Sequence, residues 1–301
     1  MPMALTTPLS VPRPATSKPV VCKGCVLRAS PDWVDAVGEN WADRIMTQSI
    51  DDRFHAKQGR TIAKWAIPGG PTVYLKRHFE LPRKYGILAT LFPNRHWSPG
   101  LQEADRLEWA ARQGLFVPRV VAAGEFRKPW GEMQSFLAVE ELTGMLPLHE
   151  AVAVALLNLS SDEFAAWKRG LIAEMARMTR ELHKCRAFHK DLYLCHFFVH
   201  DSDLRTVPTN WTNRVALIDF HRLGRYRLFW AKWQAKDLAQ LLYSTFDIPG
   251  ITARDRVRFW KLLVEGDWGN VAKPPRIVRF TAAIKADRYY RHNLKLLARA
   301  A

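Results

Sequence analysis

The stretch "FHKDLYLCHFFVH", residues 188–200, places one carboxylate, Asp191, among three histidines and several aromatic side chains. Such a group of titratable residues suits three kinds of segment: a metal site, a catalytic loop, or a histidine-rich part of the core. The elements on either side of the stretch, and the charged residues that they carry, separate these interpretations.

A long helix is predicted directly before this stretch, over residues 162–186. Its apolar residues recur at steps of three and four, which is the repeat of one helix face. Packing against a core accounts for this face without any ligand: Phe164, Trp167, Leu171, Met175, Met178, Leu182 and Cys185. Asp191 therefore lies in a loop that follows a core helix.

The remaining pattern places strands before helices. Alternating apolar residues after the turn Pro68-Gly69-Gly70 predict a strand, and an amphipathic repeat that stops near Gly114 predicts a helix. Runs of strands followed by runs of helices indicate an α+β fold. The predicted strands are 71–80, 135–142 and 214–222, and the predicted helices are 98–115, 162–186, 235–244, 252–265 and 276–298.

Five charged or polar residues follow one another along these elements in a meaningful order. Lys76 lies on a strand and Glu103 on the next helix. Asp191 lies in the loop, His196 five residues later, and Asp219 at the end of a later strand. The order resembles the protein-kinase set of strand lysine, helix glutamate, catalytic-loop aspartate and metal-binding residues. It predicts a bilobal, protein-kinase-like fold.

The individual letters narrow the resemblance. "HKDL" at 189–192 stands where protein kinases have His-Arg-Asp-Leu, and "DFHR" at 219–222 stands where they have Asp-Phe-Gly. With His196 in place of the loop asparagine, these motifs resemble the lipopolysaccharide core kinase (Kdo/WaaP heptose kinase) family. The segments "YLKRHF", "EWAARQGLFVPRVVAAGE", "AVEEL" and "KDLAQLLYS" are also similar to that family, and the resemblance runs from about residue 50 to residue 244.

The resemblance implies a role for each member of the set, with ATP and Mg²⁺ as cofactors. Asp191 would accept or orient the proton of a substrate hydroxyl. Lys76 would hold the ATP phosphates, and Glu103 would fix Lys76 by an ion pair. Asp219 would hold Mg²⁺, and His196 would contact the metal or a phosphate, because Mg²⁺ prefers oxygen to imidazole.

Further positions follow from the same resemblance. Gly59 lies in the glycine-poor loop expected to cover the phosphates, and Glu140 and Leu142 lie in the segment expected to bind the nucleotide. His189 and Asp237 are expected to brace the catalytic loop. Glu108 competes with Glu103 on the same helix, but five residues turn it by about 500° to another face.

The expected domains are an N-lobe over residues 46–142 and a C-lobe over 143–301, with residues 1–45 as a poorly ordered tail rich in Pro, Ser and Thr. Cys22 and Cys25 have the spacing of half a zinc ribbon or of a redox pair. No second such pair follows to complete a zinc site. Four cysteines are also too few for a disulfide framework in a chain of this length, so reduced thiols are the simpler interpretation.

Net charge completes the sequence-based picture. The chain carries 45 Lys and Arg against 29 Asp and Glu, a formal charge of +16. This excess favours an anionic partner, and an anionic glycolipid is expected rather than nucleic acid.

No apolar window suits a signal peptide or a membrane span. A cytoplasmic protein is expected, peripheral at the inner face of the inner membrane, with the basic, aromatic segments 254–260 and 274–300 as candidate contacts.

The sequence thus predicts an ATP-dependent kinase that phosphorylates a sugar hydroxyl of a lipopolysaccharide inner core or a related glycolipid. Two alternatives stay open at this stage. One is a kinase for a protein or a small molecule on the same scaffold. The other is a catalytically weak pseudokinase that serves as a binding module, which the glycine-poor phosphate loop would allow.

Overall fold

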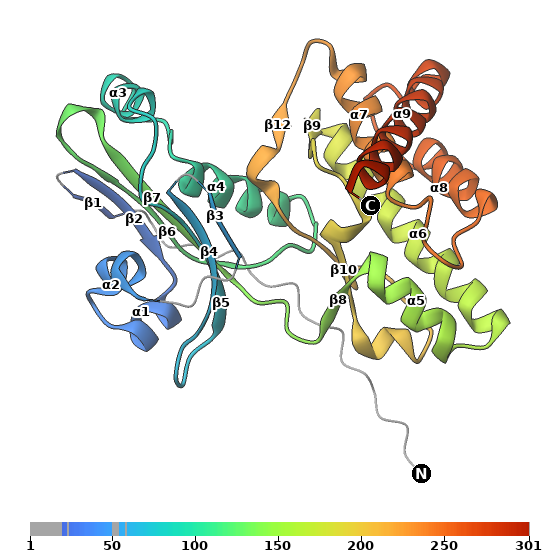
Figure 1. Ribbon diagram of the computed structural model, residues 1–301, viewed down its shortest axis with the longest axis horizontal. Coiled ribbons are helices and arrows are strands. Elements are labelled where there is room, and N and C mark those ends of the chain that lie inside the picture. Colours follow the sequence, from blue (N-terminus) through green and yellow to red (C-terminus); the bar gives the residue numbers. More distant parts are fainter. Residues whose placement is uncertain (1–19, 23, 50–53, 58, 301) are drawn as a thin grey trace. The chain divides into compact units, whose positions relative to one another are not determined.

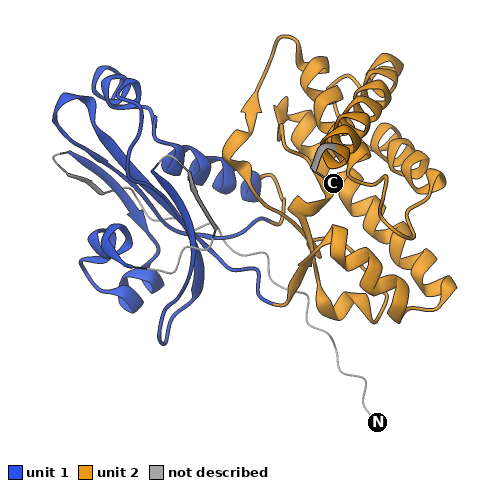
Figure 2. Ribbon diagram, in the orientation of Figure 1, with its two compact units in different colours: residues 1–112, 117–143 blue, residues 113–116, 144–301 orange. Residues whose placement is uncertain are grey.

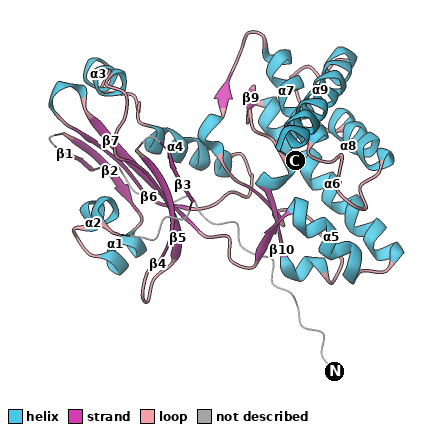
Figure 3. Ribbon diagram, viewed as in Figure 1, coloured by secondary structure: helices cyan, strands magenta, loops and turns pink. Residues whose placement is uncertain are grey.

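The computed structural model describes residues 20–22, 24–49, 54–57 and 59–300. The chain divides into two units, one of residues up to 112 with 117–143, and one of residues 113–116 with 144–301 (Figure 2). Strands dominate the first unit and helices the second (Figure 3). The predicted α+β class is therefore confirmed.

The described part of the first unit carries a seven-stranded antiparallel sheet in the order β1-β2-β6-β7-β5-β4-β3 (Figure 1). Helices α1 and α2 follow β2, and helices α3 and α4 follow β5. The bounds are β1 Val20–Cys22, β2 Cys25–Ala29, α1 Pro31–Val37, α2 Trp41–Thr47, β3 Phe54–Lys57, β4 Arg60–Ala66, β5 Thr72–His78, α3 Lys84–Leu91, α4 Pro99–Arg112, β6 Val120–Arg127 and β7 Met133–Glu140.

Strand β5 shows how this sheet places the first functional side chain. Successive side chains of a strand point to opposite faces. Val73 and Leu75 are fully buried in the core that also contains Trp33 of α1 and Ile45 of α2. Lys76 points to the opposite face, where α4 packs against β5, β6 and β7. The alternation of β5 thus presents Lys76 to α4.

The expected tail over residues 1–45 is wrong for its described part from residue 25 onward. That part contains β2, α1 and α2, whose apolar residues complete the core on one face of the sheet. Residues 1–19 lie outside the described residues.

The cysteines differ in oxidation state. Cys185 and Cys195 are free thiols, as expected, whereas Cys25 is disulfide-bonded, so the expected reduced thiol is wrong at that position.

The second unit is built around the long helix α6. The described elements of this unit are β8 Met145–Pro147, α5 Leu148–Asn158, α6 Ser161–Lys184, β9 Ala187–Phe188, β10 Phe197–His200, β11 Val215–Leu217, β12 Gly224–Arg225, α7 Trp230–Tyr243, α8 Ala253–Glu265 and α9 Arg276–Ala300. No helix among the described residues combines the length and apolar character that crossing a bilayer requires.

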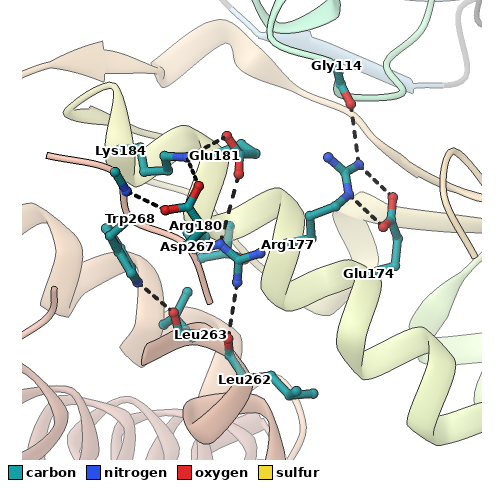
Figure 4. A network of polar contacts seen from close by, with 12 residues as sticks. Gly114, Glu174, Arg177, Arg180, Glu181, Lys184, Leu262, Leu263, Asp267 and Trp268 are labelled. Carbon is teal, nitrogen blue, oxygen red and sulfur yellow. Dashed lines mark hydrogen bonds and ion pairs between the residues drawn. The ribbon is translucent and has the colours of Figure 1, made fainter. Parts of the chain in front are cut away.

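Helix α6 begins with a capping box in which Ser160 and Glu163 each bond the other's backbone amide. The predicted apolar face is buried from Phe164 to Leu182. Polar residues on other faces of α6 bind neighbouring segments (Figure 4). Arg180 donates to the carbonyl of Leu262 in α8 at 3.1 Å, and Arg177 donates to the carbonyl of Gly114 at 3.3 Å.

Two short ladders fix the loops that follow α6. Strand β9 pairs with β12, which sets Phe188 opposite Gly224. Strand β10 pairs with both β8 and β11, which sets Phe197 opposite Leu217. Residues 189–196 therefore lie between two paired strands, β9 and β10, and Asp219 lies two residues beyond the end of β11.

Candidate active site

The loop that carries Asp191 is anchored by a carboxylate from α7. Asp237 is fully buried and accepts hydrogen bonds from the backbone amides of His189 and Lys190, at 2.8 and 2.7 Å. His183 at the end of α6 lies 3.2 Å from the same carboxylate. Lys190 has a φ of 68°, a region that costs a residue with a side chain free energy. Asp237 therefore holds the loop in a conformation that it would not adopt alone.

The Asp191 carboxylate has two side-chain neighbours within the second unit. Arg222 Nη1 lies 2.9 Å from Asp191 Oδ1. Gln240, one turn beyond Asp237 on α7, approaches the same oxygen at 3.4 Å and donates to the Tyr193 hydroxyl at 2.8 Å. The carboxylate is mostly buried and both neighbours donate to it, so its position is fixed by contacts from outside the loop.

His196 connects the loop to Asp219. Its Nδ1 lies 2.7 Å from the Asp191 carbonyl, and because a carbonyl only accepts, Nδ1 carries the proton of this bond. Its Nε2 lies 3.8 Å from Asp219 Oδ2. Burial opposes the charged ring, but contacts with Cys195, the Asp191 carbonyl and Asp219 outweigh burial and raise the pKa of His196.

Asp219 lies at a turn of left-handed backbone, with a φ of 66°. Its Oδ1 is 2.6 Å from His221 Nδ1. The preceding residue, Ile218, accepts a hydrogen bond from His189 Nε2 at 2.9 Å. Complete burial lowers the pKa of His189. His189 thus fixes the backbone before Asp219, as the expected brace would.

The donor set around Asp219 fits Mg²⁺ bound together with a phosphate substrate. Among the described residues, no group of three or more His, Cys, Asp and Glu side chains could hold a metal ion by itself. Mg²⁺ is usually held by one or two carboxylates, with phosphate oxygens and waters as the other ligands. Asp219 supplies such a carboxylate, and His196 lies beside it.

In the first unit, Lys76 and Glu103 form an ion pair, with 2.6 Å between Nζ and Oε1. Both side chains are largely buried against the sheet. Glu108 points elsewhere, toward Arg28 at 3.2 Å, and burial raises the pKa of Glu108. Of the two candidate acids of α4, Glu103 is thus the one beside Lys76. The roles of Lys76 and Glu103 toward a nucleotide stay predictions.

The other expected nucleotide contacts also lie in the first unit. Gly59 has a φ of 69° in the turn between β3 and β4, where an added Cβ would lie 3.2 Å from Glu80 Cβ. Glu140 ends β7, and its amide donates to the carbonyl of Arg119 at 2.9 Å. Leu142 follows and is half-buried. Their contacts with a nucleotide stay predictions.

Three residues of this site received no such role from the sequence: Arg222, Gln240 and His183. A signal exists for Gln240, because three residues separate it from Asp237 and place both on one helix face. A weaker signal exists for Arg222, which directly follows the "DFH" motif. His183 lies at the end of α6, outside the motifs quoted from the sequence, and it is fully buried against Asp237.

Comparison with known proteins gives this geometry a context. The lipopolysaccharide kinase (Kdo/WaaP) family matches residues 98–262, more than half of the chain. A lipopolysaccharide core heptose(I) kinase WaaP of Pseudomonas aeruginosa is 33% identical over an alignment of 168 residues, and the match covers 51% of this chain and 57% of that protein. A 3-deoxy-D-manno-octulosonic acid kinase of Photobacterium damsela subsp. piscicida is 28% identical over 187 residues, 61% of this chain and 68% of that protein.

A lipopolysaccharide core heptose(I) kinase WaaP of Escherichia coli K12 is 30% identical over 154 residues, and the match covers 51% of this chain and 56% of that protein. The chain thus spans little more than half of the length of these two WaaP proteins. A solved structure of WaaP in complex with acyl carrier protein has a TM-score of 0.63 and 24% identity, and the match covers 88% of this chain and 99% of that one. This likeness confirms the predicted protein-kinase-like fold. The family match over more than half of the residues shows that the chain belongs to the lipopolysaccharide kinase (Kdo/WaaP) family.

Proposed function

We propose that the chain is an ATP-dependent kinase that phosphorylates a sugar hydroxyl of a lipopolysaccharide inner core or a related glycolipid. The observation that carries the proposal is the Asp191 loop. Asp237 clamps its backbone, and Arg222 and Gln240 hold its carboxylate. Phosphoryl transfer depends mainly on position and charge, so a fixed carboxylate in this place suits the orientation of an attacking hydroxyl.

Asp191 is the proposed catalytic residue. Its carboxylate would accept a hydrogen bond from the acceptor hydroxyl and orient the oxygen. It would receive the hydroxyl proton as the oxygen bonds to the γ-phosphorus of ATP and the bond from that phosphorus to ADP breaks. Arg222 would hold the carboxylate through the 2.9 Å contact while the acceptor enters. Gln240 would restrict the rotation of the same group from α7.

Lys76 and Glu103 are the proposed nucleotide-positioning pair. Lys76 would neutralise phosphate charge, and the 2.6 Å contact with Glu103 would limit the lysine to one position. Gly59, Glu140 and Leu142 are proposed to contact the nucleotide. The first unit, whose core includes residues of α1 and α2, is the proposed nucleotide-binding lobe, and the second unit is the proposed acceptor lobe.

Asp219 would hold Mg²⁺ through its carboxylate, with His196 as a second contact to the metal or to a phosphate. The bound ion would neutralise phosphate charge during transfer. His221, at 2.6 Å, orients the Asp219 carboxylate within the turn. His189 and Asp237 would brace this arrangement from behind.

The acceptor class rests on the relatives and on charge. The relatives are named as kinases of heptose(I) of the lipopolysaccharide core and of 3-deoxy-D-manno-octulosonic acid, and both are sugars with hydroxyl acceptors. The formal charge of +16 suits an anionic glycolipid. We therefore place the proposed enzyme in the cytoplasm, peripheral at the inner face of the inner membrane.

The decisive test compares Asp191→Ala with wild type for Mg²⁺-dependent transfer of labelled phosphate from ATP to core glycolipid. The variant should lose transfer by about a thousandfold or more and still bind ATP. Asp162→Asn, an exposed acid in the first turn of α6, is the matched control and should match wild type. Full activity of Asp191→Ala would refute the assignment.

A partner is also proposed, from a cavity in the second unit. Apolar side chains of α6, α7 and α8 line it, including Leu171, Met175, Leu238 and Phe259. The related WaaP structure is a complex with acyl carrier protein, and an acyl chain suits such a lining. Acylated carrier protein should raise the melting temperature of this chain more than the unacylated carrier. Equal effects of the two carriers would refute an acyl site.

A further inference from the structure

The segment from residue 221 to residue 236 runs from the Asp219 turn into the first half of α7, and it contains cations without a single acid. These cations are Arg222, Arg225, Arg227, Lys232 and Lys236. Arg222 and Lys236 contact the Asp191 loop, because Arg222 reaches Asp191 and Lys236 donates to the Lys190 carbonyl at 2.7 Å. Arg225, Arg227 and Lys232 are exposed, so they give the outside of the segment a positive charge.

Two large apolar side chains stand among these exposed cations. Leu228 is 77% exposed and Phe229 is 81% exposed. Phe229 also has a φ of 53°, a region where Gly or Asn costs less than a bulky residue. Neither burial nor local backbone preference therefore accounts for a phenylalanine at this position. An exposed apolar tip of this kind is typical of a contact with another apolar phase or partner.

The base of the segment is tied to the catalytic loop. β12 pairs with β9, and the amide of Tyr226 donates to the carbonyl of Arg186 at 3.0 Å. The hydroxyl of Tyr226 accepts from Lys190 Nζ at 3.1 Å, and its ring stacks on Trp233 with 4.6 Å between centroids. Lys190 is adjacent to Asp191. A partner that binds Leu228 and Phe229 would therefore also restrict the position of the proposed catalytic carboxylate, through Tyr226 and Lys190.

Helix α9 extends the positive surface beside α7. Burial and the positive charges of Lys232 and Arg288 lower the pKa of Lys285. Lys285 thus stands between cations on its own helix and on α7, which pack together. Cations gathered in this way raise the local positive potential and favour an anionic surface over water.

We propose that Arg225, Arg227, Leu228, Phe229 and Lys232 form a docking surface for an anionic bilayer. The three cations would bind lipid phosphates, while Leu228 and Phe229 enter the boundary between headgroups and acyl chains. The inference rests on the proposed function, since docking would bring a membrane-bound glycolipid to Asp191. Adjacent apolar and basic groups match the layers of a bilayer surface better than nucleic acid, whose phosphates offer Leu228 no apolar layer.

The first experiment measures co-sedimentation of the full chain with vesicles, without ATP. Wild type should bind vesicles that contain phosphatidylglycerol and should bind phosphatidylcholine vesicles weakly. Arg225→Gln/Arg227→Gln should weaken binding to the anionic vesicles by about fivefold for each cation removed. Leu228→Ser/Phe229→Gly should weaken it by about tenfold or more, because the apolar groups that enter the bilayer boundary are lost. Glycine accepts the positive φ of residue 229, so the backbone there need not change.

Matched controls come from exposed residues elsewhere in the second unit. Arg169→Gln/Arg205→Gln removes two exposed cations, and Leu157→Ser removes an exposed leucine of α5. Both should bind anionic vesicles as wild type does. The docking surface is overturned if wild type shows no preference for anionic vesicles, or if its variants bind as tightly as these controls.

The second experiment connects docking to transfer. Phosphate transfer is measured to glycolipid in anionic vesicles and to the same core oligosaccharide after removal of its acyl chains. Both docking variants should lose transfer on vesicles and keep it on the soluble acceptor, while an equal loss on the two would overturn the proposal. A wild type that binds anionic vesicles but phosphorylates neither acceptor would overturn the proposed function and leave the docking surface supported.

Discussion

Arg222 Nη1 lies 2.9 Å from Asp191 Oδ1, although 31 residues separate the two along the chain. The arginine is 51% exposed and the aspartate only 13% exposed. The pair therefore joins the proposed catalytic carboxylate to a cation that solvent can reach. In the proposed reaction the arginine orients the carboxylate and contributes little to the stability of the fold.

Arg222→Gln tests whether the arginine acts on the orientation of Asp191 and not on the stability of the fold. A half-exposed ion pair contributes about 0–1 kcal/mol to stability, so the free energy of unfolding should change by less than that. The kcat for phosphate transfer should fall about tenfold, because Asp191 keeps only the longer contact with Gln240. Arg222→Lys should recover part of the loss, since lysine keeps the charge without the planar fork. Unchanged kcat in Arg222→Gln would contradict the positioning role.

Glu103→Gln should raise the KM for ATP by about tenfold, because Lys76 then loses the partner that limits its position. Steady-state kinetics with varied ATP checks this. Glu108→Gln is the matched control on the same helix, since Glu108 faces Arg28 at 3.2 Å. The control should lower stability and leave the KM for ATP unchanged. Similar KM values for the two variants would remove the reason for assigning the pair to nucleotide binding.

Asp237→Asn should lower the free energy of unfolding by about 2–4 kcal/mol. The side chain is fully buried and accepts from two backbone amides, and an amide NH₂ group would face one of these donors without an acceptor. Urea unfolding followed by tryptophan fluorescence measures the loss. Asp267→Asn, in an exposed loop, is the control, and a loss as small as in that control would show that the brace is not needed.

His189 should make the protein less stable at acid pH. Burial lowers its pKa below the ordinary value of 6.5, so below that pH the unfolded chain binds a proton that the folded chain does not. Stability from this group is complete above pH 6.5 and falls as the pH drops, by up to ~1.4 kcal/mol per pH unit. In His189→Asn this contribution is absent, so the stability gap between wild type and variant should narrow on acidification. Parallel pH profiles would contradict the assignment.

Much of the fold could be predicted because the long helices and several strands have clear apolar patterns within their own residues. The buried face of α6 follows from the spacing of Phe164 to Leu182, and β5 follows from the alternation of Val73 and Leu75. Helices α1 and α2 could not be predicted in this way, since each has only seven residues. A window of that length holds too few turns for a clear apolar repeat, and the Pro-rich residues before it suggested a tail.

The candidate site divides in the same way. Lys76, Glu103, Asp191 and Asp219 could be found from motifs and their order, because each motif is a short run of letters on a recognisable element. The contacts of Arg222 with Asp191 and of His183 with Asp237 could not. The second pair is separated by 54 residues, and such contacts depend on the path of the chain through β9, β12 and α7.

The sequence by itself determined the order of the chemical groups and the kind of element that carries each one, since both depend on neighbours within a few residues. The tertiary structure decided which groups hold Asp191 and Asp237, and it left Leu228 and Phe229 exposed between cations. The physical reason is that periodicity reports which face of an element is buried, whereas the partner of a buried or exposed side chain is chosen only when distant segments pack together.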